Sequence, residues 1–179
     1  MAFAFFPSTG SPTELEIGFD QADTRVSFFE LQSRVPSTWT NIEPSSSMRL
    51  LQMSAPGADA DAAAELVVYF FGPGQGGDFE SNVERWTGQF SSPGGGSVEP
   101  IVERFDVGDL AVTVVELTGT YRRDAGGMPG QPVADRTLLA AIVDTGRGTL
   151  FVQMHGPAQT VAAQRAAYDL FLRALRPVQ

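Results

Sequence analysis

The chain has 179 residues, 42% of them hydrophobic, and a formal net charge of −9, and all twelve of its basic residues are arginine. A chain of this length can form one domain with a substantial core, and its hydrophobic content is too high for a disordered protein. The absence of cysteine excludes disulfides, thiolate metal sites and cysteine nucleophiles. The absence of lysine excludes Schiff-base chemistry. The negative charge argues against nucleic acid and anionic membrane surfaces as partners.

Residues 1–24 are predicted to be a loosely ordered lead-in, because prolines and glycines occur there among polar residues. One short strand is expected near Leu15–Phe19. The segment has neither a charged start followed by a long apolar run nor a clear cleavage site, so we expect no signal peptide in it, and the apolar run Met1–Phe6 is too short to span a membrane. Residues 25–179 are then expected to form a single α+β domain.

Three strand-like runs come next, at Arg25–Leu31, Met48–Ser54 and Glu65–Phe71. The third run is apolar at nearly every position. This pattern is typical of a central strand that is covered on both faces.

Gly72, Gly74 and Gly77 follow the third run in the G-x-G-x-x-G spacing of dinucleotide-binding loops. However, Pro73 removes one N–H donor from the loop, and the carboxylate of Asp78 would compete with a phosphate for the N–H groups at the start of the next helix. That helix also leads into no evident parallel strand. We therefore interpret the glycines as a strand-to-helix turn that needs positive φ, and we expect no cofactor there.

The helix after this turn has Asp78 as its predicted N-cap, with Ser81 as an alternative. Its apolar residues are spaced by four, three and four positions and therefore share one face. They are Phe79, Val83, Trp86 and Phe90. The glycine-rich segment 91–97 indicates a flexible loop.

Two hairpins are predicted in the second half, Val98–Val107 with Leu110–Tyr121 and Thr137–Asp144 with Thr149–His155. The segment 122–135 between them contains no credible element and is longer than an ordinary connection. Consecutive hairpins with the helices apart from them predict an antiparallel β-sheet packed by two principal helices, an α+β fold.

The second of these helices is expected from about Pro157 to Leu175, with Pro157 in its first turn and Pro177 after its end. Four residues form its predicted buried stripe. They are Val161, Tyr168, Leu172 and Leu175.

His155 is the only histidine, so a multi-histidine metal site is excluded. A serine triad would need a nucleophile elbow of the G-x-S-x-G type, and the sequence has none. We interpret His155 as a structural residue near the surface or a helix N-terminus. No catalytic residue is predicted, and we expect the protein not to be an enzyme.

Two groups of acids are the candidate metal ligands. They are Glu103, Asp106 and Asp109, and the pair Asp59 and Asp61. Neither group has the spacing of an EF-hand loop. We interpret them as solvated acids, with weak calcium binding as the alternative, and predict no metal site.

The best candidates for partner binding are Tyr121, Arg122 and Arg123, because they open the long 122–135 segment and long loops on a rigid sheet often bind partners. A solvated loop edge is the alternative. Trp86 is expected in the core. Trp39 is expected there too, with an exposed ligand platform as its alternative.

Several short segments resemble the PsbP/Mog1/DcrB-like superfamily over about residues 25–178. An early strand is followed by "VPSTW", and the closing helix ends in "AYDLFLRALRP", with Ala174 where serine is usual. The segments "PSSSMRLLQM", "NVERWTGQF" and "GTY" also resemble a set of bacterial proteins, many of them predicted to be exported or lipid-anchored. Mature exported members would carry a signal or a lipobox cysteine, and this sequence shows neither.

Members of this superfamily are chiefly non-enzymatic accessory proteins: extrinsic subunits of photosynthetic complexes, a partner of a small GTPase, and envelope lipoproteins. The resemblance implies an accessory module that docks onto a larger protein assembly, at the bacterial cell envelope, with no cofactor and no membrane span. The alternative is a small-molecule or carbohydrate-binding protein, or a weak hydrolase, that uses a cleft near the 122–135 segment.

Overall fold

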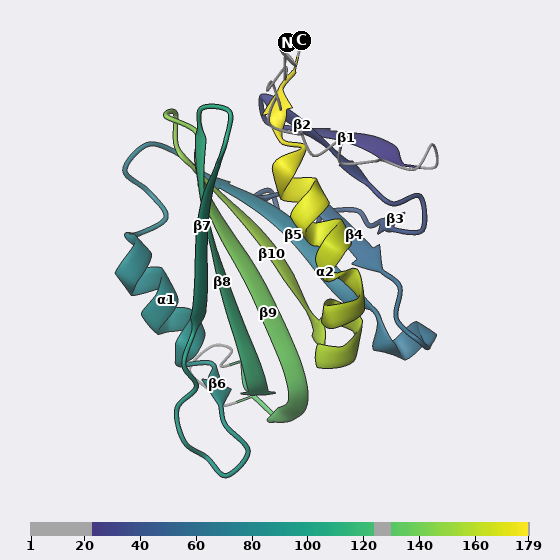
Figure 1. Cartoon of the computed structure of the whole chain (residues 1–179), viewed down its shortest axis with the longest axis vertical. Helices are drawn as coiled ribbons and strands as arrows, with labels where there is room; N and C mark the ends of the chain where they lie inside the picture. Colours follow the sequence, from purple (N-terminus) through teal and green to yellow (C-terminus); the bar gives the residue numbers. More distant parts are fainter. Residues whose placement is uncertain (1–22, 124–129, 179) are drawn as a thin grey trace, which may run out of the picture.

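The computed structural model describes residues 23–123 and 130–178 (Figure 1). The elements in chain order are β1 (Thr24–Phe28), β2 (Leu31–Val35), β3 (Thr40–Asn41), β4 (Arg49–Ala55), the 3-10 helix η1 (Ala60–Ala62), β5 (Ala64–Phe71), α1 (Phe79–Thr87), β6 (Phe90–Ser91), β7 (Ile101–Val107), β8 (Leu110–Tyr121), β9 (Val133–Asp144), β10 (Thr149–Pro157), α2 (Ala158–Arg173) and β11 (Arg176–Pro177).

The large sheet has the strand order β3-β4-β5-β10-β9-β8, and every strand pair in it is antiparallel. Two further strands, β6 and β7, pair with different parts of β8 at the same edge. The two predicted hairpins are confirmed as β7–β8 and β9–β10. The predicted fold class, an antiparallel sheet packed by two principal helices, is therefore confirmed.

The two helices cover opposite faces of this sheet (Figure 1). We call these faces the α1 face and the α2 face. Successive side chains of a strand point to opposite faces, so Leu66 and Val68 of β5 lie in the core under α2, while Phe151 of β10 lies in the smaller core under α1. No helix within residues 23–123 and 130–178 has the length and apolar character to cross a membrane.

The core under α2 contains the predicted stripe of that helix. Val161, Tyr168, Leu172 and Leu175 are all buried, as predicted, and Phe171 is buried with them. However, the helix ends at Arg173, two residues before the predicted end, so Leu175 lies just beyond it. The helix begins one residue later than expected, since Pro157 still pairs in β10 and serves as the N-cap.

The N-terminus of α1 is capped as predicted, because the Asp78 carboxylate accepts a hydrogen bond from the Ser81 backbone N–H at 2.7 Å. Trp86 is buried, as predicted, and its ring lies edge-on to Phe151 with centroids 6.0 Å apart. The prediction that Phe90 belongs to this helix is wrong. The helix ends at Thr87 with Gly88 as its C-cap, and Phe90 begins β6 while still packing into the same core.

A second, three-stranded sheet has the order β1-β2-β11. The single strand predicted at 25–31 is wrong, because the chain turns at Phe29 and Glu30 and folds back as β2. Phe29 adopts a positive φ of 52°, which is uncommon for a bulky residue. Its ring stacks on Phe70 with centroids 4.0 Å apart, a contact that no local sequence pattern predicts.

Other boundaries differ from the prediction. The strand expected to begin at Val98 begins at Ile101. The segment 122–135 is not free of elements, because β9 already begins at Val133, which pairs with Tyr121. The strand expected at 15–19 and nearly all of the 1–24 lead-in lie outside the described residues.

Candidate functional site

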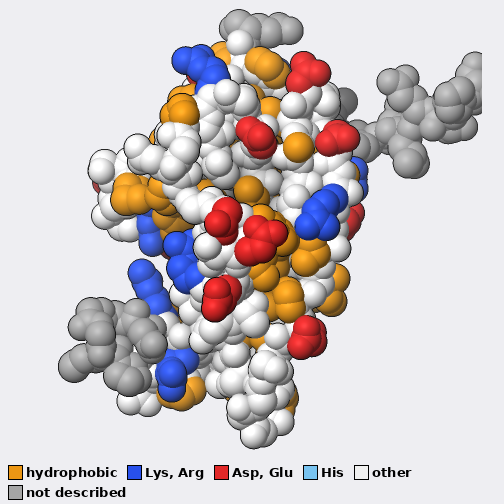
Figure 2. All heavy atoms as spheres, turned by 90° about the vertical axis from the view of Figure 1, so that its left-hand side faces the viewer, with side chains coloured by type: hydrophobic (Ala, Val, Ile, Leu, Met, Phe, Trp, Pro, Cys, Tyr) orange, Lys and Arg blue, Asp and Glu red, His pale blue; other side chains and the backbone are white. Residues whose placement is uncertain are grey.

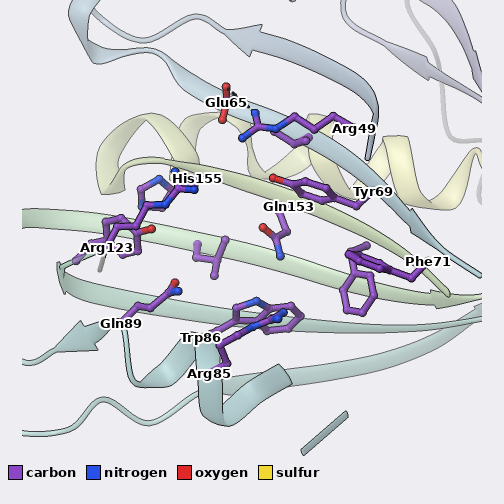
Figure 3. Close-up of a pocket in the computed structure, with 14 residues that line it drawn as sticks. Arg49, Glu65, Tyr69, Phe71, Arg85, Trp86, Gln89, Arg123, Gln153 and His155 are labelled. Carbon is purple, nitrogen blue, oxygen red and sulfur yellow. Dashed lines mark ion pairs between the residues drawn. The ribbon is translucent and has the colours of Figure 1, made fainter. Parts of the chain in front are cut away.

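A cavity of about 380 Å³ opens on the α1 face (Figure 3). We call it the α1-face cavity. Its lining residues come from β4, β5, β8, β9, β10 and α1, with Gln89 and Arg123 just beyond element ends. The part of the sheet that α1 leaves uncovered therefore forms a recess. Its volume is near the lower end of the range of about 300 to 1,000 Å³ that is usual for ligand pockets.

Aromatic side chains form much of the wall. They are Tyr69, Phe71, Trp86, Tyr121 and Phe151. The Phe71 and Phe151 rings meet edge to face, with centroids 5.3 Å apart and an interplanar angle of 90°. Because Phe151 makes the same kind of contact with Trp86, these three rings hold one another in place.

Three arginines also line the cavity, from three different parts of the chain. Arg49 lies 3.6 Å from Glu65, as the dashed line in Figure 3 marks, and 5.7 Å from the centre of the Tyr69 ring. Arg85 donates to the amide oxygen of Asn82 at 2.5 Å and lies beside the Trp86 ring. Arg123 is exposed at the end of β8.

Gln153 points into the cavity between Tyr69 and Trp86 (Figure 3). It occupies an α1-face position of β10, a strand whose neighbours are mostly apolar. Its amide offers both a donor and an acceptor inside a largely aromatic recess.

His155 lies at one end of the cavity, with the Tyr121 ring 4.3 Å away between centroids. Burial first, and then the positive charges of Arg136 and Arg123, lower the pKa of His155 to about 4. Arg136 approaches Nδ1 at 3.5 Å, and arginine can only donate, so the neutral ring carries its proton on Nε2. That Nε2 is buried and has no partner among the described residues.

Of the three predicted partner-binding residues, the structure brings two to the cavity. Tyr121 and Arg123 line it. Arg122 is not among the lining residues, and its backbone N–H donates to the Gln89 carbonyl at 2.8 Å. His155, interpreted from the sequence as structural, lines the cavity as well.

The other sequence candidates lie elsewhere. Glu103 forms ion pairs with Arg165 and Arg173 of α2, while Asp106 and Asp109 are exposed. Among the described residues, no three histidine or acidic side chains gather as a metal site would require.

Trp39 is buried, as predicted, and its indole Nε1 donates to Gln164 of α2 at 2.9 Å. The glycine turn has positive φ at Gly74 and Gly77, as predicted, and also at Gly76, whereas Gly72 has ordinary geometry.

Sequence reasoning missed Arg49, Arg85 and Gln153 as cavity residues. The one available signal was Gln153, an isolated polar residue on the face that packs Phe151 in the predicted strand 149–155. Neither arginine carried a sequence signal for a cavity, because charged residues at the end of a strand or on a helix are usually solvated.

No protein-family model matches the sequence, and no curated protein is significantly similar to it. Solved structures do match its fold. The solution structure of cyanobacterial PsbP (CyanoP) from Synechocystis sp. PCC 6803 matches with a TM-score of 0.55 and 13% sequence identity, over 96% of this chain and 98% of that one.

LpqN of Mycobacterium tuberculosis, described as involved in cell envelope biogenesis, matches with a TM-score of 0.51 and 11% identity, over 88% of this chain and 91% of that one. At these identities the likeness is one of fold. The chain therefore has a PsbP-like fold, as the sequence motifs implied.

Proposed function

We propose that this protein is a non-catalytic binding module that holds a small ligand in the α1-face cavity. The observation that carries the proposal is the cavity itself, an aromatic recess with a few polar groups directed into it, which is the usual composition of a ligand site. Tyr121 and Arg123, two of the residues that the sequence favoured for partner binding, line it.

The surroundings of His155 support binding over catalysis. The groups that contact its ring are Tyr121, Phe90 and Arg136, and among the described residues no carboxylate forms an ion pair with it, although Glu65 lies opposite it on β5. A histidine that acts as a general base is usually oriented by an acid and works with a pKa near 7. The lowered pKa of His155 removes it from that range.

A fragment screen by ligand-observed NMR tests this proposal, with Gln153→Trp as a variant that fills the cavity. The control is Gln159→Trp, which adds the same side chain at an exposed position of α2. We expect the screen to find fragments that bind the wild type and the control with similar affinity. The same fragments should bind Gln153→Trp at least ten times more weakly. Circular dichroism of each variant shows whether it is folded. A screen without hits, or hits that Gln153→Trp retains, would contradict the proposal.

We propose as a second function that the module is an accessory protein at the bacterial cell envelope. The support is the fold that it shares with cyanobacterial PsbP and with LpqN, whose description names cell envelope biogenesis. Tyr121, Arg122 and Arg123 are the proposed contact residues. Cross-linking in the source cells should capture a partner protein with the wild type. The double variant Arg122→Glu/Arg123→Glu should no longer capture this partner, whereas the control Arg104→Glu should still capture it. Equal capture by both variants would contradict this contact surface.

A further inference from the structure

The α1-face cavity differs in charge from the rest of the molecule. The chain carries a net charge of −9, whereas three arginines and one glutamate line the cavity. In Figure 2, most basic side chains lie along the left-hand side of the view and a smaller group lies at its right, while acidic ones are spread over its centre and right. A local excess of positive charge on an acidic protein favours an anion at this place.

The three cavity arginines differ in their ion pairs. Arg49 already has Glu65 as its partner. Within the described ranges, no carboxylate forms an ion pair with Arg85 or Arg123. A guanidinium offers a planar fork of N–H donors that matches the oxygens of a carboxylate or a phosphate.

Arg85 is also held in position. The Asn82 amide oxygen accepts from its Nη2, and Asn82 in turn donates to the carbonyls of Gly76 and Asp78, both at 2.8 Å. Asn82 is buried. A guanidinium fixed through a buried amide loses less conformational entropy on binding than a free surface arginine does.

The same cavity offers an apolar surface beside these charges. Trp86 and Phe151 line it but are only 3% and 2% exposed, so the apolar surface that a ligand can reach belongs to the partly buried rings of Tyr69, Phe71 and Tyr121. A ligand that is only an inorganic ion would leave this surface in water. A compact ring or short aliphatic body would bury it, which is favourable.

One polar side chain inside the cavity suits an oxygen-rich ligand. The amide of Gln153 offers a hydrogen-bond donor in the middle of the recess.

We propose that the α1-face cavity binds a small organic anion, which has a carboxylate or phosphate headgroup on a compact apolar body. The headgroup binds Arg85 or Arg123, and the body lies against the partly buried rings of Tyr69, Phe71 and Tyr121. The inference rests on the proposed binding function and adds the class of ligand.

Three probes with the same ring test it: 2-naphthoate, 2-naphthyl phosphate and the neutral 2-naphthamide, each titrated by calorimetry at pH 7. We expect at least one of the two anions to bind ten times more tightly than the amide, and the stronger one identifies the headgroup. The double variant Arg85→Gln/Arg123→Gln should weaken that anion at least tenfold and change binding of the amide less than twofold.

The control is Arg25→Gln/Arg104→Gln, which removes the same charge from two exposed arginines that do not line the cavity. It should leave all three affinities within twofold. The inference is overturned if the amide binds as tightly as both anions, or if the two double variants weaken the anion equally. If the amide binds as tightly as the anions, the ligand class is wrong but the proposed binding function still stands. If the fragment screen finds no ligand, the proposed binding function itself is contradicted.

Discussion

The rings of Tyr121 and His155 lie with their centroids 4.3 Å apart at one end of the α1-face cavity. Tyr121 is the last residue of the long strand β8, and His155 lies on β10, two strands away in the sheet. Burial raises the pKa of Tyr121 and lowers the pKa of Arg136 beside it. The pair therefore stays a neutral, hydrogen-bonding surface at physiological pH.

The neutral state of His155 predicts a pH dependence of stability. Its pKa is about 4 in the folded protein and 6.5 in the unfolded one, so the unfolded chain binds more protons between these values. The stability that the neutral His155 ring contributes is fully present above pH 6.5 and is lost as the pH falls toward 4. Linkage predicts that the wild type loses about 2 kcal/mol of unfolding free energy from this group between pH 7.5 and pH 5.

Urea unfolding of the wild type and of His155→Gln at both pH values measures this effect. The carboxylates titrate in both proteins, so the difference between the two pH dependences isolates His155. Parallel loss of stability in the two proteins would show that His155 is protonated as easily when folded as when unfolded.

Tyr168 is predicted to stabilise the sheet through its hydroxyl group. The group is fully buried and donates to the Val152 carbonyl at 2.9 Å, and burial raises its pKa so that it remains a donor. Tyr168→Phe should lower the free energy of unfolding by about 1 kcal/mol. Tyr69→Phe is the matched control, because the Tyr69 side chain is only half-buried, and it should change stability by less than about 0.5 kcal/mol. Equal effects in chemical denaturation would refute the assigned role.

The glycine turn before α1 gives a third prediction. Gly76 has a φ of +92°, and a Cβ there would lie 3.0 Å from the Phe151 ring and 3.1 Å from Phe71 Cβ. Gly76→Ala should therefore destabilise the protein by about 1 to 2 kcal/mol. Gly72→Ala is the control, because Gly72 has ordinary φ and its Cβ would approach nothing closer than 4.0 Å. Thermal melts that rank the two variants the other way would contradict this account of the turn.

Features with a local cause could be predicted from the sequence. The cap of α1 depends on residues three apart, Asp78 and Ser81. The buried strand Ala64–Phe71 and the two hairpins have periodicity and turn residues within a short window. The reversal at Phe29 has no glycine or asparagine to signal it, and its ring contact with Phe70 is long-range.

The cavity could not be predicted as a whole, because its walls come from segments far apart in the chain. The register of β10 on β5 places Gln153 opposite Val67 and His155 opposite Glu65. A pattern within one segment carries no information on that register. Tyr121 and Arg123 were found from the sequence only because they open a long loop.

The most direct test of the central claim uses the two tryptophans of the chain. Trp86 lines the α1-face cavity, whereas the Trp39 indole N–H is bonded to Gln164 on the α2 side. Two-dimensional ¹H–¹⁵N NMR resolves both indole signals, and Trp39→Phe assigns them. On titration with 2-naphthoate or 2-naphthamide, a ligand in the cavity shifts the Trp86 signal and leaves the Trp39 signal in place. Titrations in which neither compound shifts the Trp86 signal, or in which both indole signals shift equally, would contradict a binding site on the α1 face.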